Sequence, residues 1–63
     1  MAAQAFQRAV ELRPQSHVAH YNLARAYLAL GDHKRAAEEA AVAARLYPSP
    51  DYQALLSQLQ TGS

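Results

Sequence analysis

Apolar residues recur along the chain at steps of three and four positions, a spacing that places them on one face of a helix. Phe6, Ala9 and Val10 show it near the start of the sequence. No stretch alternates apolar and polar residues in the way that a half-buried strand requires. The pattern therefore predicts an all-α chain. Near the other end it gives a complete apolar stripe, which consists of Tyr52, Leu55, Leu56 and Leu59.

Local signals divide most of the chain into three helices. Pro14 ends a helix of about residues 2–12, because proline disfavours helical backbone in the residue before it. Ser16 can cap a second helix, which runs to about Leu30. Gly31 then provides the residue that tolerates positive φ after a helix, and Asp32 caps a third helix that runs to about residue 46.

A fourth helix begins at Ser49, Pro50 and Asp51. Serine is a favoured cap, proline fits the first helical position, and an acid there faces the positive end of the helix dipole. This helix runs to about Gln60 and leaves a tail at residues 61–63. Fifteen of the 63 residues are alanine, the best helix former, which supports this four-helix interpretation.

Residues at matching places in successive helices lie 34 positions apart. Pro14 and Pro48 are separated by this distance (48 − 14), and so are Leu12 and Leu46. In an alanine-rich chain, a few identical residues at a fixed offset are expected by chance. The placement of these residues at equivalent points of two helices is the stronger indication, and it predicts a helical repeat of this length.

The stretch from Tyr21 to Asp32, followed by small residues and a proline, resembles the tetratricopeptide repeat (TPR). That family has units of two antiparallel helices. Its signature places leucine, a small residue and tyrosine in the first helix, and glycine and aspartate at the turn. Small residues follow in the second helix, and a proline ends the unit. The matching positions here are Leu23, Ala24, Tyr27, Gly31, Ala36, Ala43 and Pro48.

The chain also departs from the family pattern. His20 and Ala40 stand where the family often has a large aromatic residue, although Phe6 fills the equivalent of Ala40 one repeat earlier. After Pro50 the match weakens, and Ser57 stands where the signature leucine would recur. We therefore interpret the fourth helix as a terminal cap, whose polar outer face closes a solenoid.

The resemblance implies one helical domain over residues 1–63, built as an antiparallel helix-turn-helix solenoid fragment. Residues 2–14 would supply the second helix of a preceding repeat, and residues 17–50 a complete repeat. Residues 51–60 would form the capping helix, and residues 61–63 the tail.

In this family the first helix of each repeat lines a concave surface where peptides or partner helices bind, so the resemblance implies protein–protein interaction. A rotation of 100° per residue divides the second helix into two sides. The side expected to pack against neighbouring helices carries Ala19, His20, Leu23, Ala26, Tyr27 and Leu30. The side expected to bind a partner carries Val18, Tyr21, Asn22, Arg25 and Leu28.

Alternatives stay open for several of these residues. Two interpretations are open for Tyr21 and Leu28: they line the groove, or a neighbouring element buries them. Two are also open for Arg25: it contacts a carboxylate of the partner, or it is an ordinary solvated charge. Asn22 matches one residue of the clamp with which some relatives hold a C-terminal carboxylate. Tyr21, however, stands where that clamp needs a lysine.

Composition narrows the range of functions. The net charge of +1 is too balanced to indicate nucleic acid or a membrane surface as the main partner. The sequence has no cysteine and no apolar run of a membrane span, and its start lacks a signal-peptide pattern. The compartment is therefore not indicated beyond a cytoplasmic default. On the third helix, Lys34–Glu38 and Arg35–Glu39 are i, i+4 pairs in the less favourable order, and we interpret them as a solvated face.

Catalytic and metal chemistry find little support in the sequence. Nothing resembles a nucleophile with its base, a phosphate-binding glycine loop or paired carboxylates, so we expect neither an enzyme nor a cofactor. His17 and His20 have a spacing that can share a metal, and His33 starts the next helix. No acid or thiol completes such a set nearby, so we favour packed or solvated histidines.

A second function class is self-assembly. A chain of about 60 residues buries only about 60% of its unfolded surface, so its stability is marginal. Phe6, Val10 and Leu12 lack the helix that would complete their repeat. A symmetric homodimer through an open helix face is the alternative to binding another protein or peptide.

Overall fold

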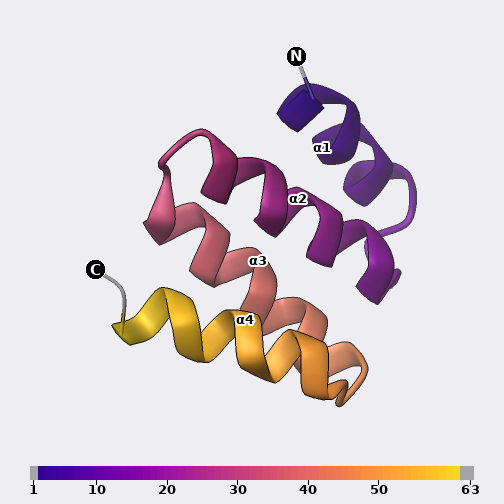
Figure 1. Cartoon of the computed structure of the whole chain (residues 1–63). Coiled ribbons are helices and arrows are strands. Elements are labelled where there is room, and N and C mark those ends of the chain that lie inside the picture. The colour runs from indigo at the N-terminus through magenta and orange to yellow at the C-terminus, as the bar shows by residue number, and fades with distance from the viewer. Residues whose placement is uncertain (1, 62–63) are drawn as a thin grey trace.

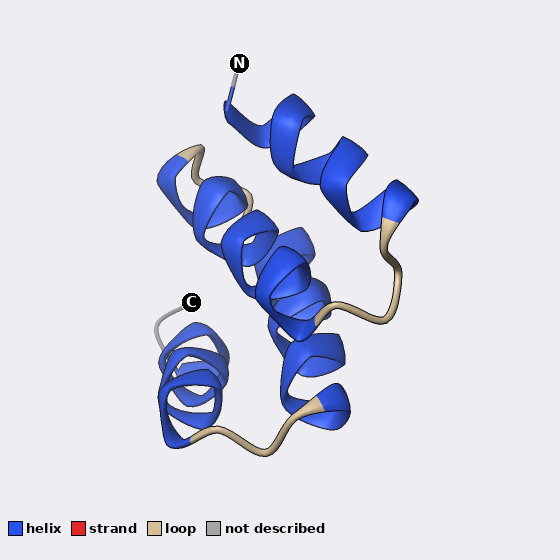
Figure 2. Cartoon of the chain, turned by 90° about the vertical axis from the view of Figure 1, so that its right-hand side faces the viewer, coloured by secondary structure: helices blue, strands red, loops and turns tan. Residues whose placement is uncertain are grey.

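Four α-helices follow one another in the computed structural model, which describes residues 2–61: α1 (Ala2–Leu12), α2 (His17–Ala29), α3 (His33–Leu46) and α4 (Pro50–Thr61). Successive helices pack against each other in antiparallel fashion, and α1 and α4 lie at opposite ends of the array (Figures 1 and 2). The all-α architecture expected from the sequence is confirmed. Of the expected tail, Gly62 and Ser63 lie outside the described residues, as does Met1.

The turn between α2 and α3 is built around Gly31. Its φ of 84° lies in the region that glycine occupies without strain. The Gly31 N–H donates to the carbonyl of Leu28 at 3.0 Å, and the Asp32 N–H donates to the carbonyl of Tyr27 at 2.9 Å. These are the two bonds of a Schellman motif, which satisfies the last carbonyls of a helix. The expected tight turn at Gly31 and Asp32 is confirmed.

Side-chain caps begin the other helices where the sequence places them. Each cap oxygen accepts a backbone N–H that would otherwise lack a partner within its helix. The pairs are Ser16 Oγ with Ala19 N at 3.3 Å, Asp32 Oδ1 with Arg35 N at 3.2 Å, and Ser49 Oγ with Asp51 N at 3.3 Å.

Alanine forms the centre of the core. Six of the ten buried apolar residues in the described part of the chain are alanines. Ala24 of α2 and Ala36 and Ala40 of α3 have no exposed surface, and they join Leu55 and Leu59 of α4 in one cluster. Such small side chains let helix backbones approach closely. The larger side chains around the cluster therefore supply most of the buried area.

The predicted packing side of α2 agrees with the structure in part. The prediction omitted Ala24, which has no exposed surface, and it included Leu30. Ala19, His20, Leu23 and Ala26 are buried. Leu30, however, is 56% exposed. It follows the end of α2 as the C-cap residue, so its side chain is carried into the turn instead of along the helix.

Truncation of Leu23 tests this core. Its side chain is 2% exposed, so Leu23→Ala should lower the free energy of unfolding by about 2–5 kcal/mol and unfold much of a marginally stable chain. The exposed Leu30 provides the matched control, since Leu30→Ala should change stability by less than about 0.5 kcal/mol. Urea titrations followed by circular dichroism compare the two. Equal losses from both variants would contradict the assignment of the core.

Candidate functional site

An open groove runs between α1 and α2. Phe6, Ala9 and Leu12 form its wall on α1, and Val18 and Asn22 are among the residues that form its wall on α2. Its volume is about 360 Å³. Leu12 is 72% exposed and Val18 is 50% exposed, so the described part of the chain leaves these apolar side chains uncovered.

Arginines contribute positive charge to this groove and to the hollow next to it. Arg13 lines the groove together with Ser16. Arg25 lines the adjoining hollow with Phe6 and Ala26. Within residues 2–61, neither arginine forms an ion pair, and no acidic side chain lines either space. The two guanidinium groups are therefore available to a carboxylate from outside.

The five side chains expected to bind a partner divide between two surfaces. Val18, Asn22 and Arg25 border the space beside α1. Tyr21 and Leu28 instead pack against the core cluster that contains Leu55 and Leu59 of α4. Tyr21 and Leu28 are therefore half-buried, beside residues of α4. The partner-binding role of the five residues stays a prediction.

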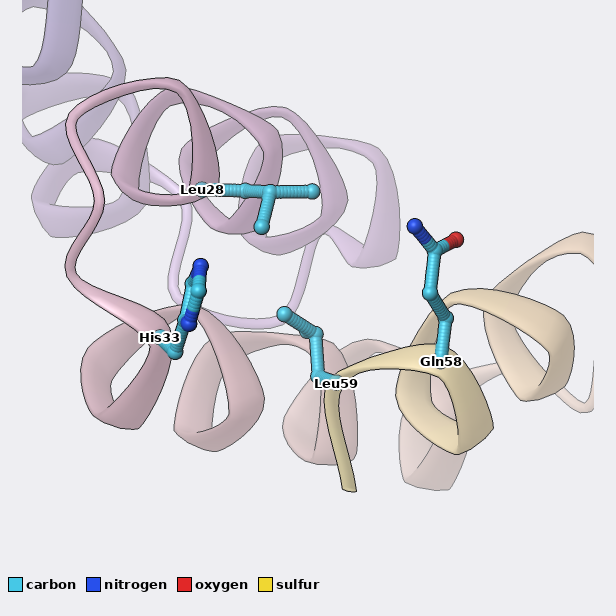
Figure 3. A pocket seen from close by; sticks show the side chains of 4 residues that line it. All are labelled: Leu28, His33, Gln58 and Leu59. Atoms are coloured by element: carbon cyan, nitrogen blue, oxygen red, sulfur yellow. The ribbon is translucent and has the colours of Figure 1, made fainter. Parts of the chain in front are cut away.

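A smaller pocket marks the place where Leu28 meets α4. Its volume is about 100 Å³, and its other lining residues are His33, Gln58 and Leu59. Figure 3 shows Leu28 on α2 facing His33 and Leu59, which reach toward it from the opposite side of the gap. The pocket is smaller than the groove beside α1, so it offers less room for a partner.

Aromatic rings join the starts of α2 and α4. The His17 and Tyr47 rings stack with centroids 4.5 Å apart, and the Tyr21 and Tyr52 rings lie 4.6 Å apart. A hydrogen bond of 2.6 Å links His17 Nδ1 with the Tyr52 hydroxyl. Sequence reasoning missed this cluster. Its one signal was the gathering of aromatic residues around Pro48 and at the start of α2.

Arg25 is connected to this cluster through Tyr21. The central carbon of its guanidinium group lies 5.9 Å from the centroid of the Tyr21 ring, within the range of a cation–π contact. Tyr21, the aromatic member of this pair, also packs against the Tyr52 ring of α4. The orientation of Arg25 thus depends on where α4 sits.

His20 ties α2 to two other parts of the chain. It is 7% exposed, and its Nε2 lies 2.7 Å from the carbonyl oxygen of Pro14. That oxygen only accepts, so Nε2–H donates the bond. The other ring nitrogen, Nδ1, lies 2.7 Å from the Glu39 carboxylate on α3. His20 is therefore a buried polar side chain with a hydrogen-bond partner at each ring nitrogen.

Of the residues interpreted as a solvated face on α3, Lys34, Arg35 and Glu38 are exposed, whereas Glu39 is half-buried. Glu39 turns inward to His20, so it does not pair with Arg35, which instead faces Asp32 at 3.6 Å. No ion pair among residues 2–61 joins Lys34 to Glu38 either. The i, i+4 rule describes exposed helix faces, and Glu39 has a buried partner that the rule does not consider.

The three histidines do not gather. His17 bonds with Tyr52, His20 bonds with Pro14 and Glu39, and His33 is exposed at the start of α3. Across residues 2–61, no three histidine, aspartate or glutamate side chains lie close enough to hold one metal ion. Among α1–α4, no helix has both the length and the apolar character needed to cross a bilayer.

The arrangement of the four helices indicates the class of protein. Antiparallel helix pairs, small residues at their crossing and a glycine turn within the pair are the features of an α-helical solenoid repeat. The chain belongs to the tetratricopeptide repeat family, whose profile matches residues 2–59. Repeats of this family are in general protein–protein interaction modules and are typically non-catalytic. Comparison with curated proteins and with solved structures gave no match.

The acid–base behaviour of Tyr52 makes the α4 contact testable. Burial raises the pKa of Tyr52 above its ordinary value of 10.0, and neighbouring Tyr21, Tyr47 and Asp51 raise that pKa further. Between the unfolded and folded pKa values the folded chain holds more protons than the unfolded chain, so stability falls as pH rises. We expect the stability of the chain to fall as the pH rises above about 10.

Tyr52→Phe separates this residue from the other titrating groups. It removes the ionisable hydroxyl, so stability should depend less on pH above about pH 10, although the lost bond to His17 lowers stability at neutral pH by about 1 kcal/mol. Tyr47→Phe is the comparison variant. Tyr47 is 52% exposed and raises the pKa of Tyr52 less than burial does, so the alkaline transition should be largely retained. Thermal melts at several pH values measure both. An unchanged alkaline transition in Tyr52→Phe would contradict this assignment.

Proposed function

We propose that this chain binds a protein partner on the open side of α2, where α1 and α2 form the groove. The observation that carries this proposal is the uncovered apolar surface of Leu12 and Val18 in a member of a protein-binding repeat family. Single exposed apolar residues are common on any protein. Here two of them share a concave space with Phe6, which favours a docking surface.

The lining residues supply the usual elements of recognition. Phe6, Leu12 and Val18 offer apolar area, and the removal of this area from water favours association. Asn22 offers an amide that both donates and accepts. Arg25 offers a planar fork of donors that fits a carboxylate. These groups bind without any covalent step.

Tyr21 and Leu28 contribute indirectly in this proposal. Tyr21 holds Arg25 through its ring face and is itself held by Tyr52. Leu28 packs on the cluster shared by α2, α3 and α4. Both therefore fix the position of α2 relative to α4 and support the surface that Val18 and Arg25 present.

A selection experiment tests the proposal while the natural partner is unidentified. A displayed library of random peptides is selected on the 63-residue chain, and enriched peptides are measured by titration. Val18→Ser and Arg25→Ala should each weaken binding by about fivefold or more, since contacts of this kind contribute about 1 kcal/mol or more. Both residues are exposed, so far-UV circular dichroism should stay unchanged.

Arg45→Ala is the matched control. Arg45 is an exposed arginine in the last turn of α3 and lines neither the groove nor the hollow beside it. The control should bind the selected peptides like the parent chain. Peptides that bind all three variants equally would show that the surface lies elsewhere on the molecule.

Self-assembly is the second candidate, and the same exposed leucine and valine favour it. In that case the groove of one chain would meet a second copy, and the chain would sediment as a dimer that dilution dissociates. Analytical ultracentrifugation over a wide concentration range separates the two candidates. A folded monomer at every concentration would support binding to another protein and would exclude the homodimer.

A further inference from the structure

We propose that the groove between α1 and α2 takes an amphipathic helix of a partner protein, and that this helix carries acidic side chains beside its apolar face. The inference rests on the proposed function and adds the shape and charge of the partner. Three observations support it: the place of the groove within the repeat, its length along α2, and the charge of its lining.

The internal repeat indicates that the groove is shaped for a helix. Phe6 and Ala9 of α1 correspond to Ala40 and Ala43 of α3 at the 34-residue offset (40 − 6 and 43 − 9). Ala40 and Ala43 have no exposed surface, and Ala40 packs in the cluster that contains Ala24 of α2. The same face is thus fully buried on α3 and only half-buried on α1. A helix placed on Phe6 and Ala9 would lie as α2 lies on α3, at a wider spacing because Phe6 stands in place of Ala40.

The groove accommodates about two helical turns. Its lining on α2 and that of the adjoining hollow extend from Val18 to Arg25, which at 1.5 Å per residue is about 10 Å along the axis. A helical partner would cover this length with apolar residues at positions i, i+3 or i+4, and i+7. An extended peptide would place only about three residues over the same length.

The charge of the lining selects the polar part of the partner. Arg13 and Arg25 line the groove and its adjoining hollow, and neither space has an acidic residue in its lining. Neither arginine is paired within residues 2–61, so each keeps its capacity for a bidentate bond to a carboxylate. A partner helix that brings carboxylates near both arginines would be complementary in charge as well as in shape.

The same charges disfavour a second copy of the chain in this position. A symmetric dimer through the groove would bring Arg13 and Arg25 of both copies together, and no acidic residue lines the contact. A head-to-tail contact would place the outer face of α4 on the apolar groove, and that face carries the exposed Gln53 and Gln60. A separate acidic helix matches the groove better than either arrangement.

Three synthetic peptides of equal length test the inference on the full chain. Each has an apolar leucine and alanine stripe at helical spacing, and the flanking positions carry glutamate, glutamine or lysine. The glutamate peptide should bind about tenfold tighter than the glutamine peptide, the scale that two exposed ion pairs supply, and the difference should shrink as salt is added. The lysine peptide should bind weakest. A glutamate peptide with a central proline should lose affinity, because proline breaks the helix.

A charge reversal locates the contact. The double variant Arg13→Glu and Arg25→Glu should reverse the preference, so that the lysine peptide binds tighter than the glutamate peptide. Arg45→Glu changes the charge of an exposed arginine outside the groove and should leave the preference as it is. Circular dichroism of each variant shows whether it stays folded.

The outcomes separate this inference from the proposed function. Equal affinity for the glutamate and glutamine peptides would overturn the acidic partner and keep a binding groove. Unchanged affinity of the proline peptide would overturn the helical partner. Failure of every peptide to bind a folded monomer would contradict the proposed function as well. A stable dimer that dissociates when Val18 is changed to Ser would show that a second copy occupies the groove.

Discussion

The close approach of α2 and α3 through alanine is the constraint on which this molecule depends. Ala24, Ala36, Ala40 and Ala43 have no exposed surface, so nothing larger fits at the crossing without separating the helices. Alanine buries little apolar area, and the hydrophobic gain at the centre is correspondingly small. The contact sets the geometry, and residues around it must provide the stability. Leu23, Tyr52, Leu55 and Leu59 take that role, three of them from α4.

Polar contacts add to the stability that the small apolar core supplies. His20 is buried at a position where the family often has a large aromatic residue, and it links Pro14, α2 and α3 by two short hydrogen bonds. Within the described residues, no buried side-chain nitrogen or oxygen lacks a partner. Burial of a polar group costs little free energy of folding when all its hydrogen bonds are made, and it costs much more when one of them is lost. The position of the loop before α2, and with it the groove wall on α1, is therefore fixed by bonds as well as by packing.

The parts of the structure that follow from neighbouring residues could be predicted from the sequence. The caps at Ser16, Asp32 and Ser49 and the turn at Gly31 depend on residues within three or four positions, and each lies where expected. A helical rotation also identified four of the five buried residues of α2 and missed Ala24. The prediction for Leu30 was wrong because the rotation was continued beyond the point where the helix ends.

Contacts between distant residues could not be predicted in the same way. Glu39 bonds with a residue 19 positions away, whereas the sequence rule compared it with Arg35 on its own helix. Rotation placed Tyr21 and Leu28 on the side opposite the core but did not reveal which helix lies there, because the docking direction of α4 depends on the whole array. The groove itself needs the placement of α1, whose sequence shows only an apolar face.

The order of the helices also has a consequence for how the chain opens. In an array where each helix packs mainly on its neighbours in sequence, an outer helix can detach while the remainder stays folded. The two ends differ in this respect, since α4 is tied to α2 by the bond between Tyr52 and His17, whereas α1 rests mainly on α2. Amide hydrogens of α1 should therefore exchange with solvent first, through a local detachment that leaves α2 and α3 protected. The α1 wall of the groove is therefore the part of the molecule that we expect to open first. A bound partner would slow amide exchange along α1.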